Sequence, residues 1–319
     1  MEVAPADWNA LLARVGLTDV YLTREYVESA CLLEPGEPVL LAHGDVVFPL
    51  ILRSFEGRTD VVTPYGYGGP VAAEPEGAPA FYDAYEAWCG DRGVVSTFVR
   101  FHSLYENERY SRFHVEPLGA TVAWRLDGDD LLERTHAHHR RLVRKAERAE
   151  LEATVRERAG LDEFVALYEQ TMRRLDADAF YLFSADYWES LRSLPTLLVE
   201  VRREDELLAA VLCFDSAPWL HYHLGAQSDE GRRLGGSQLA LFAAATWGRE
   251  RAYELLHLGG GVGGRRDSLF EFKQRFDPGA GDREFFVGKA IHDAGAYREL
   301  AGTDGLDGFF PAYRDTSRR

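Results

Sequence analysis

The chain has 319 residues, of which 46% are hydrophobic, and a formal net charge of −16 at pH 7. This length fits one large domain or two of ordinary size, with enough apolar residues for a packed core. The acidic balance argues against a general nucleic-acid coat and leaves room only for a local basic groove. Three widely spaced cysteines without metal-ligand spacing favour reduced thiols and a cytoplasmic protein. Neither a signal peptide nor an apolar stretch of ~18 residues is recognisable, so no membrane span is expected.

The first 130 residues predict a mixed α/β domain. Its expected helices cover 7–15, 23–33 and 78–91, and its expected strands cover 38–42, 46–52, 60–63, 94–100 and 121–125. One strand runs into the loop PYGYGGP at 64–70, which two prolines stiffen and three glycines allow to turn tightly. Tyr65 and Tyr67 would project to the same side of an extended loop. They are candidate substrate-binding residues, although surface tyrosines of an ordinary turn would show the same pattern.

A basic stretch follows at 131–157 and predicts one long helical segment. Between Arg134 and Arg148 its only acidic residue is Glu147, which is unusual in an acidic chain. Its arginines and lysine either bind phosphates or form a solvated helix face paired with acids elsewhere. The spacing of its three histidines does not stack two imidazoles on one helix face, so no metal site is expected.

The remaining sequence repeats the order of the first half: helices, antiparallel strands, helix, strand. Helices are expected at 161–175, 186–194 and 237–250, and strands at 196–202, 207–215, 219–225 and 255–258. On the strand at 219–225, Tyr222 should face away from His221 and His223. The repeat predicts two domains, 1–130 and 131–290.

The stretch from 254 to 276 contains the strongest anomaly. A glycine-rich loop follows the strand, and Ser268 and Glu271 have the spacing of a capping box, so a helix should begin near Leu269. On that helix Lys273 falls within the apolar stripe formed by Leu269, Phe272 and Phe276, yet the chain has only three lysines. Either Lys273 extends its amine into water over Phe276, or it acts at a site beside the loop.

Three local patterns together resemble the Fem-type (FemABX-like) aminoacyl-tRNA-dependent aminoacyltransferases. They are PYGYGGP at 64–70, HHRRLVRKAE at 138–147 and DSLFEFKQRF at 267–276, of which the F-K-x-x-F ending is the most specific. The resemblance implies an α/β fold of the α+β type with two tandem GNAT-like domains. Each domain would be a mixed, mostly antiparallel sheet flanked by helices. Residues after about 290 would cross back to the first domain.

The same resemblance implies an enzyme that moves an aminoacyl group from aminoacyl-tRNA to an amine, forming an amide. The acceptor would be a peptidoglycan precursor or a small natural product. No cofactor or metal would be needed, and a cytoplasmic monomer is expected. Because the ester is already activated, the enzyme needs positioning and oxyanion stabilisation more than a nucleophile. The resemblance places Lys273 at the reacting ester with Phe272 beside it. The candidate substrate-binding residues are Tyr65, Tyr67, Arg141, Arg144, Lys145, Tyr222, His223, Asp267 and Arg275.

Two alternatives remain open at this point. An ordinary GNAT acyltransferase would bind acetyl-CoA through a loop of the pattern [QR]-x-x-G-x-[GA] before a helix. The sequence R-R-L-G-G-S from Arg232 to Ser237 fits this pattern except at its last position. The second alternative is a non-catalytic binding module that kept the double fold, against which the placement of Lys273 argues.

Overall fold

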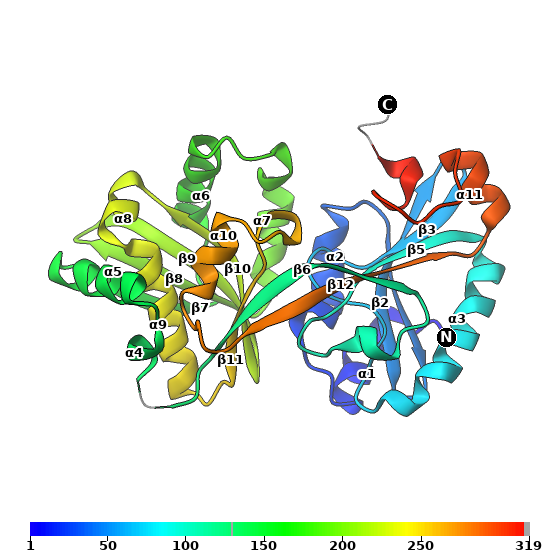
Figure 1. Ribbon diagram of the computed structural model, residues 1–319, viewed down its shortest axis with the longest axis horizontal. Helices are drawn as coiled ribbons and strands as arrows, with labels where there is room; N and C mark the ends of the chain where they lie inside the picture. The colour runs from blue at the N-terminus through cyan, green and yellow to red at the C-terminus, as the bar shows by residue number, and fades with distance from the viewer. Residues whose placement is uncertain (129, 316–319) are drawn as a thin grey trace. The chain divides into compact units, whose positions relative to one another are not determined.

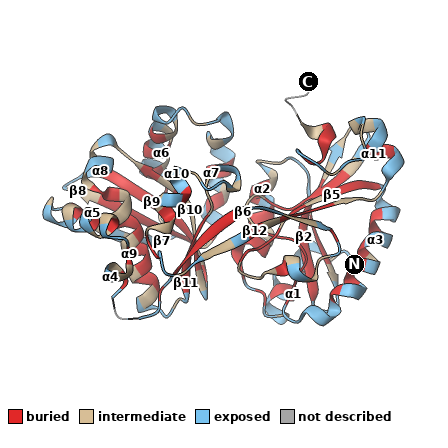
Figure 2. Cartoon of the chain, viewed as in Figure 1, coloured by how far each residue is buried: buried red, intermediate tan, exposed pale blue. Residues whose placement is uncertain are grey.

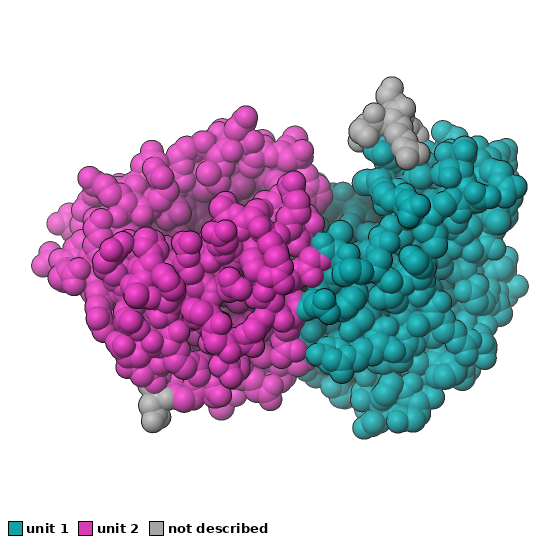
Figure 3. Space-filling view, viewed as in Figure 1, with its two compact units in different colours: residues 1–118, 284–319 teal, residues 119–283 magenta. Residues whose placement is uncertain are grey.

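The computed structural model describes residues 1–128 and 130–315. The chain divides into two compact units, coloured separately in Figure 3: unit 1 is Met1–Leu118 with Glu284–Arg319, and unit 2 is Gly119–Arg283. The sequence placed these changes at 130/131 and after about residue 290. Both boundaries instead fall inside strands, β6 (His114–Arg125) and β12 (Asp282–Ile291). Pro117 and Gly119 lie at the first boundary, but strand β6 continues through both of them, so these residues do not end the strand there.

Unit 1 is a mixed sheet covered by helices on both faces (Figure 1). Its strands follow the order β1-β2-β3-β5-β12, with β4 beside β2, and every pairing is antiparallel except that of β3 with β5. The helices are α1 (Trp8–Arg14), α2 (Arg24–Cys31), α3 (Ala78–Arg92) and α11 (Ala294–Ala301). The other strands are β1 (Glu37–His43), β2 (Val46–Phe55), β3 (Arg58–Val62), β4 (Val71–Ala72) and β5 (Val94–Arg100).

Strand β2 explains the two covered faces of unit 1. Phe48 and Leu50 pack in a cluster with α3, whereas Val47 and Ile51 pack in a cluster with α1 and α2. A strand covered on both faces reads as a continuous apolar run, which is what the sequence shows here. Burial accordingly follows the strands in Figure 2.

Unit 2 is a second mixed sheet, with strand order β6-β11-β10-β9-β8-β7. Only β10 and β11 pair in parallel. Its helices are α4 (Leu131–Arg134), α5 (Ala137–Arg148), α6 (Asp162–Arg174), α7 (Ala185–Ser190), α8 (Asp229–Leu234), α9 (Gly236–Glu250) and α10 (Ser268–Gln274). Its other strands are β7 (Glu152–Glu157), β8 (Thr196–Arg203), β9 (Glu206–Ser216), β10 (Trp219–Gln227) and β11 (Leu255–Gly259).

The prediction of one long helical segment at 131–157 is wrong. The segment is divided into α4, α5 and strand β7, which pairs with β8. Helix α5 ends at Arg148, and Glu150 then takes a positive φ of 57°. Residues 152–157 alternate between exposed and half-buried side chains, the period of an edge strand. Within the described residues, no helix is long and apolar enough to cross a membrane.

Candidate functional site

The candidate site in unit 2 lies where the two parallel strands part. The register of β10 with β11 covers Trp219–His221 against Leu255–His257, and β10 then continues to Gln227. A bulge follows Tyr222 in β10, where the register against β9 shifts. Bulges of this kind redirect side chains and are common beside functional sites. The sheet is therefore irregular just after the parallel pairing ends, at Tyr222.

Lys273 reaches this place from α10. Its residue is 6% exposed, and its Nζ donates a hydrogen bond of 2.6 Å to the carbonyl oxygen of Gly260, just after β11. The same nitrogen lies 5.3 Å from the centre of the Tyr222 ring. The amine is thus held inside unit 2 by a carbonyl and an aromatic face, which is not the position of a surface lysine with its amine in water.

Burial lowers the pKa of Lys273 to about 7, while the charge of Asp267 opposes this shift. Burial would raise the pKa of Asp267, but the backbone N–H groups of Phe270, Val262 and Leu269 outweigh it and hold that pKa below its usual value. Near neutral pH the site therefore contains a carboxylate and an amine that is protonated in about half of the molecules.

The start of α10 differs from the prediction. Asp267, not Ser268, is the N-cap, and its Oδ1 accepts a bond of 3.0 Å from the backbone N–H of Phe270. The predicted apolar stripe is also partly wrong, because Leu269 is 36% exposed while Phe270 is buried. Either Asp or Ser can cap a helix, so spacing alone could not choose between neighbouring residues.

Helix α5 packs against α10 through His139. The Nε2 of buried His139 lies 2.8 Å from the carbonyl oxygen of Phe272, and its ring contacts those of Phe272 and Phe276. Burial lowers the pKa of His139 to about 4, although the bond to Phe272 opposes this. The neutral ring therefore donates from Nε2, and this histidine fixes the backbone next to Lys273. The carbonyl of Arg275 also accepts a bond from the backbone of His136.

The three basic candidates of α5 have individual partners. Arg144 Nη2 lies 2.7 Å from Glu133 Oε1, a pair in which both side chains are half-exposed. Arg141 Nη2 contacts His138 Nδ1 at 3.1 Å, and Lys145 Nζ donates to the carbonyl oxygen of Arg233 at 2.7 Å. The arginines stay on the exposed side of the helix, where pairs of this kind contribute little to stability.

The remaining unit 2 candidates divide between the two faces of the sheet. Tyr222 packs with the core under α9 and α10, whereas His223 stacks on Phe214 and hydrogen-bonds the Tyr187 hydroxyl at 2.9 Å. Burial lowers the pKa of His223 to about 3. The structure thus brings Tyr222, Asp267 and Phe272 close to Lys273, but it places His223 on the other face.

The helix start that would bind CoA phosphates in an ordinary GNAT enzyme is covered in this chain. Gly235 is buried with a φ of 91°, and a Cβ there would lie 2.7 Å from the carbonyl oxygen of Leu142 in α5. Arg232 and Arg233 point into ion pairs with the acids of their own helix, α8. Helix α5 therefore packs directly against the residue that precedes α9.

The PYGYGGP loop belongs to unit 1. The Tyr67 ring packs edge-on against Tyr21 and Phe285, and burial raises the pKa of its hydroxyl. The Tyr65 carbonyl accepts a bond of 2.5 Å from the Tyr26 hydroxyl. Both tyrosines are half-buried rather than projecting freely.

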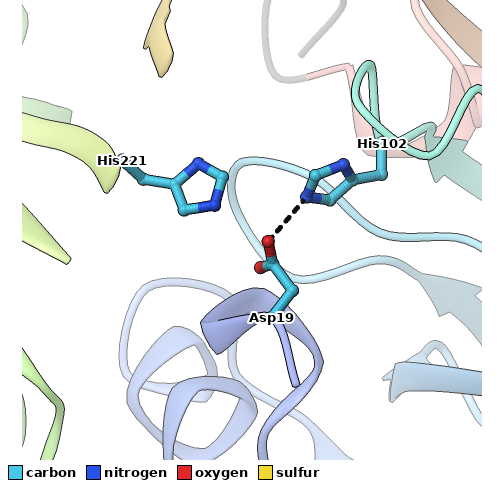
Figure 4. A group of neighbouring side chains, drawn as sticks. All are labelled: Asp19, His102 and His221. Atoms are coloured by element: carbon cyan, nitrogen blue, oxygen red, sulfur yellow. Dashed lines mark ion pairs between the residues drawn. The ribbon is translucent and has the colours of Figure 1, made fainter. Parts of the chain in front are cut away.

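Buried polar residues that the sequence did not single out hold this loop. Asn107 Nδ2 donates to the carbonyl oxygens of Gly68 and Pro70, and Asn107 Oδ1 accepts from the backbone of His102. His102 Nε2 lies 3.4 Å from Asp19 Oδ2 (Figure 4). Because these residues are distant in the sequence and form no motif, only the fold could have found them.

Comparison with known proteins assigns the fold. Residues 133–274 match the family described as acetyltransferase (GNAT) domain. Comparison with curated protein sequences finds no match. The chain is similar to the crystal structure of FemX, at 14% identity and a TM-score of 0.70, covering 94% of this chain and 99% of that one. It is also similar to L-PGS from Bacillus licheniformis, at 15% identity and a TM-score of 0.61, covering 92% and 93%.

A tandem GNAT protein from the clavulanic acid biosynthesis pathway is a further similar structure, at 11% identity and a TM-score of 0.50, covering 92% of this chain and 98% of that one. At these identities the similarities describe the fold alone. The chain has a GNAT-type acyltransferase fold with two tandem GNAT-like domains, each a mostly antiparallel sheet flanked by helices. The fold prediction is therefore confirmed.

Proposed function

We propose that the protein is an aminoacyltransferase that takes an aminoacyl group from aminoacyl-tRNA and joins it to an amine of a small-molecule or peptide acceptor. The observation that carries the proposal is the buried amine of Lys273, held beside the glycine-rich loop at the end of the parallel strand pair. The similarity of fold to FemX and L-PGS supports the same class of reaction.

The chemistry needs a cation at one point. An amine attacks the carbonyl carbon of the ester, and negative charge develops on the carbonyl oxygen. The C–O bond to the tRNA ribose then breaks, and the proton lost by the nitrogen is balanced by the one that the ribose oxygen gains as it leaves as a hydroxyl. An ammonium has three N–H donors. One of them on Lys273 is occupied by Gly260, which leaves two for the developing oxyanion or a nearby phosphate. A hydrogen bond to a developing oxyanion is stronger in a site from which water is excluded.

Acetyl-CoA is the second candidate donor. The GNAT fold and the R-R-L-G-G-S sequence favour it, but α5 covers Gly235 at the place where the CoA pyrophosphate would approach. Leu142 contacts Gly235, and Lys145 donates to the Arg233 carbonyl, so α5 is packed against this loop. We therefore favour the aminoacyl-tRNA donor.

A donor panel tests the proposal. The purified protein is incubated with cell extract as the source of acceptor, and either with a set of charged tRNAs or with acetyl-CoA. We expect transfer from at least one aminoacyl-tRNA and loss of that transfer after ribonuclease treatment. Tight binding of acetyl-CoA together with product formation that resists ribonuclease would select the ordinary GNAT reaction instead.

A further inference from the structure

Asp267 joins the glycine-rich loop to the helix that carries Lys273. Its Oδ1 accepts the backbone N–H of Phe270 at 3.0 Å, and its Oδ2 accepts the backbone N–H of Val262 at 2.9 Å. One oxygen thus caps α10 while the other holds the loop that follows β11.

The loop is fitted closely around this carboxylate. A Cβ at Gly261 would lie 2.2 Å from Asp267 Oδ1 and equally close to the carbonyl oxygen of Arg265. The residue before it, Gly260, supplies the carbonyl that accepts from Lys273. The position of that carbonyl therefore depends on a loop that Asp267 holds and that has no room for a side chain at Gly261.

Asp267 is also the charge that acts on Lys273. The phenol of Tyr222 faces the amine from β10, and burial raises its pKa, so it stays neutral. His139 faces the same helix from α5, and its lowered pKa keeps it neutral as well. The guanidinium of Arg275, at the end of α10 itself, pairs with Glu271.

We propose that Asp267 is a positioning residue for Lys273: its carboxylate holds the loop whose Gly260 carbonyl orients the amine, and its negative charge favours the protonated form of that amine. The catalytic importance of this positioning rests on the proposed function. The orientation and protonation of Lys273 can nevertheless be measured without any substrate.

The direct test follows the three lysines by NMR in the full chain, with isotope-labelled Cε positions. Lys273 is assigned by its loss from the spectrum of Lys273→Met. In Asp267→Asn, which keeps the side-chain volume and removes the charge, we expect the pKa of Lys273 to fall by at least about 0.5 pH unit. The signals of Lys145 and Lys289 should titrate as in the wild type. An unchanged Lys273 pKa in a folded Asp267→Asn protein overturns the proposal.

Activity gives a second readout. A fall of one pH unit in the pKa of Lys273 lowers its protonated fraction at pH 7 about fivefold. The loss of turnover in Asp267→Asn should therefore be largest above pH 7 and should recover as the pH is lowered. A loss of the same size at every pH would mean that Asp267 acts on the fold alone.

The matched control is Asp293→Asn. Asp293 caps α11 in unit 1 with the same bond, from its carboxylate to the N–H of Ala296 at 2.9 Å, and it lies outside the candidate site. This variant should leave the Lys273 pKa and the pH profile unchanged.

Gly261→Ala serves as the second variant, because Asp267→Asn could unfold α10. It keeps every ionisable group but forces the carboxylate or the loop to move. We expect a shifted Lys273 signal and lower turnover, whereas an unaltered signal with normal turnover would refute the positioning role. Failure of the ribonuclease test with a shifted Lys273 pKa would refute the proposed donor and leave the positioning of the amine intact.

Discussion

Replacing Lys273 by Met should lower activity and raise stability at the same time. Methionine keeps most of the volume of the lysine stem but removes the amine that donates to Gly260. Loss of one oxyanion donor typically costs about 10²–10³ in kcat. We expect a folded Lys273→Met protein with turnover lower by about that factor.

The stability change follows from the pKa of Lys273. A lysine whose pKa falls from 10.5 to about 7 on folding destabilises the folded state at every pH where the unfolded state holds the extra proton. The lowered pKa reduces the free energy of unfolding by at most about 5 kcal/mol at pH 7 and below, and this reduction disappears as the pH rises to 10.5. The free energy of unfolding of Lys273→Met should therefore exceed that of the wild type at pH 7, and the two should converge at high pH.

Lys289→Met is the control for this prediction. Lys289 is also buried, at 3% exposure, but it lies in unit 1, pairs with Glu116 and donates to the Leu306 carbonyl at 2.8 Å. Its loss should lower stability and leave the turnover of folded protein unchanged. Urea unfolding between pH 6 and 10 and steady-state turnover measure both effects. Wild-type turnover and unchanged stability in Lys273→Met would refute both its burial and its catalytic role.

Three further predictions concern the other candidates. Replacing Arg141 and Arg144 by Ala should weaken substrate binding and reduce its salt slope by about 1 for each phosphate that these arginines neutralise, whereas replacing Arg173, another exposed and paired arginine, should not. Tyr67→Phe keeps the ring packing and should raise the acceptor KM without changing the Tm; an unchanged KM would leave the hydroxyl without a role in binding. Burial lowers the pKa of His139 to about 4, so the unfolded state binds a proton at this histidine more readily than the folded state. The free energy of unfolding should therefore fall by up to about 3 kcal/mol as the pH falls from 6.5 to 4. His139→Gln should flatten this loss in urea unfolding.

Short apolar runs were enough to predict most of the sheet. Strands such as β5 and β8 are buried runs bounded by turn signals, and their boundaries match the expected ranges closely. Strand β7 was missed because its charged edge residues also suit a helix. Strand β12 was missed because it begins in a polar, glycine-flanked segment without a distinct periodic signal.

The candidate site was less predictable than the fold. Lys273 could be identified from the sequence because a lysine is unexpected in the apolar stripe of an amphipathic helix. Its burial in the structure agrees with that position. The contact by which His139 holds α10 joins segments that no spacing rule connects, and the bond from Val262 to Asp267 depends on the path of the loop between them. His139 in particular lies within a basic stretch of the sequence, yet its side chain is buried in the core.

Helix α5 contacts both the start of α9 and the helix that carries Lys273. On one side the Leu142 carbonyl lies against Gly235, at the start of α9. On another side His139 holds the Phe272 carbonyl and with it the turn that carries Lys273. The same helix that packs against the start of α9 thus supports the buried amine. A substitution that detached α5 should therefore open the start of α9 and loosen Lys273 together. By this reasoning, a variant of this chain that gained acetyl-CoA binding at Gly235 would lose the orientation of its lysine.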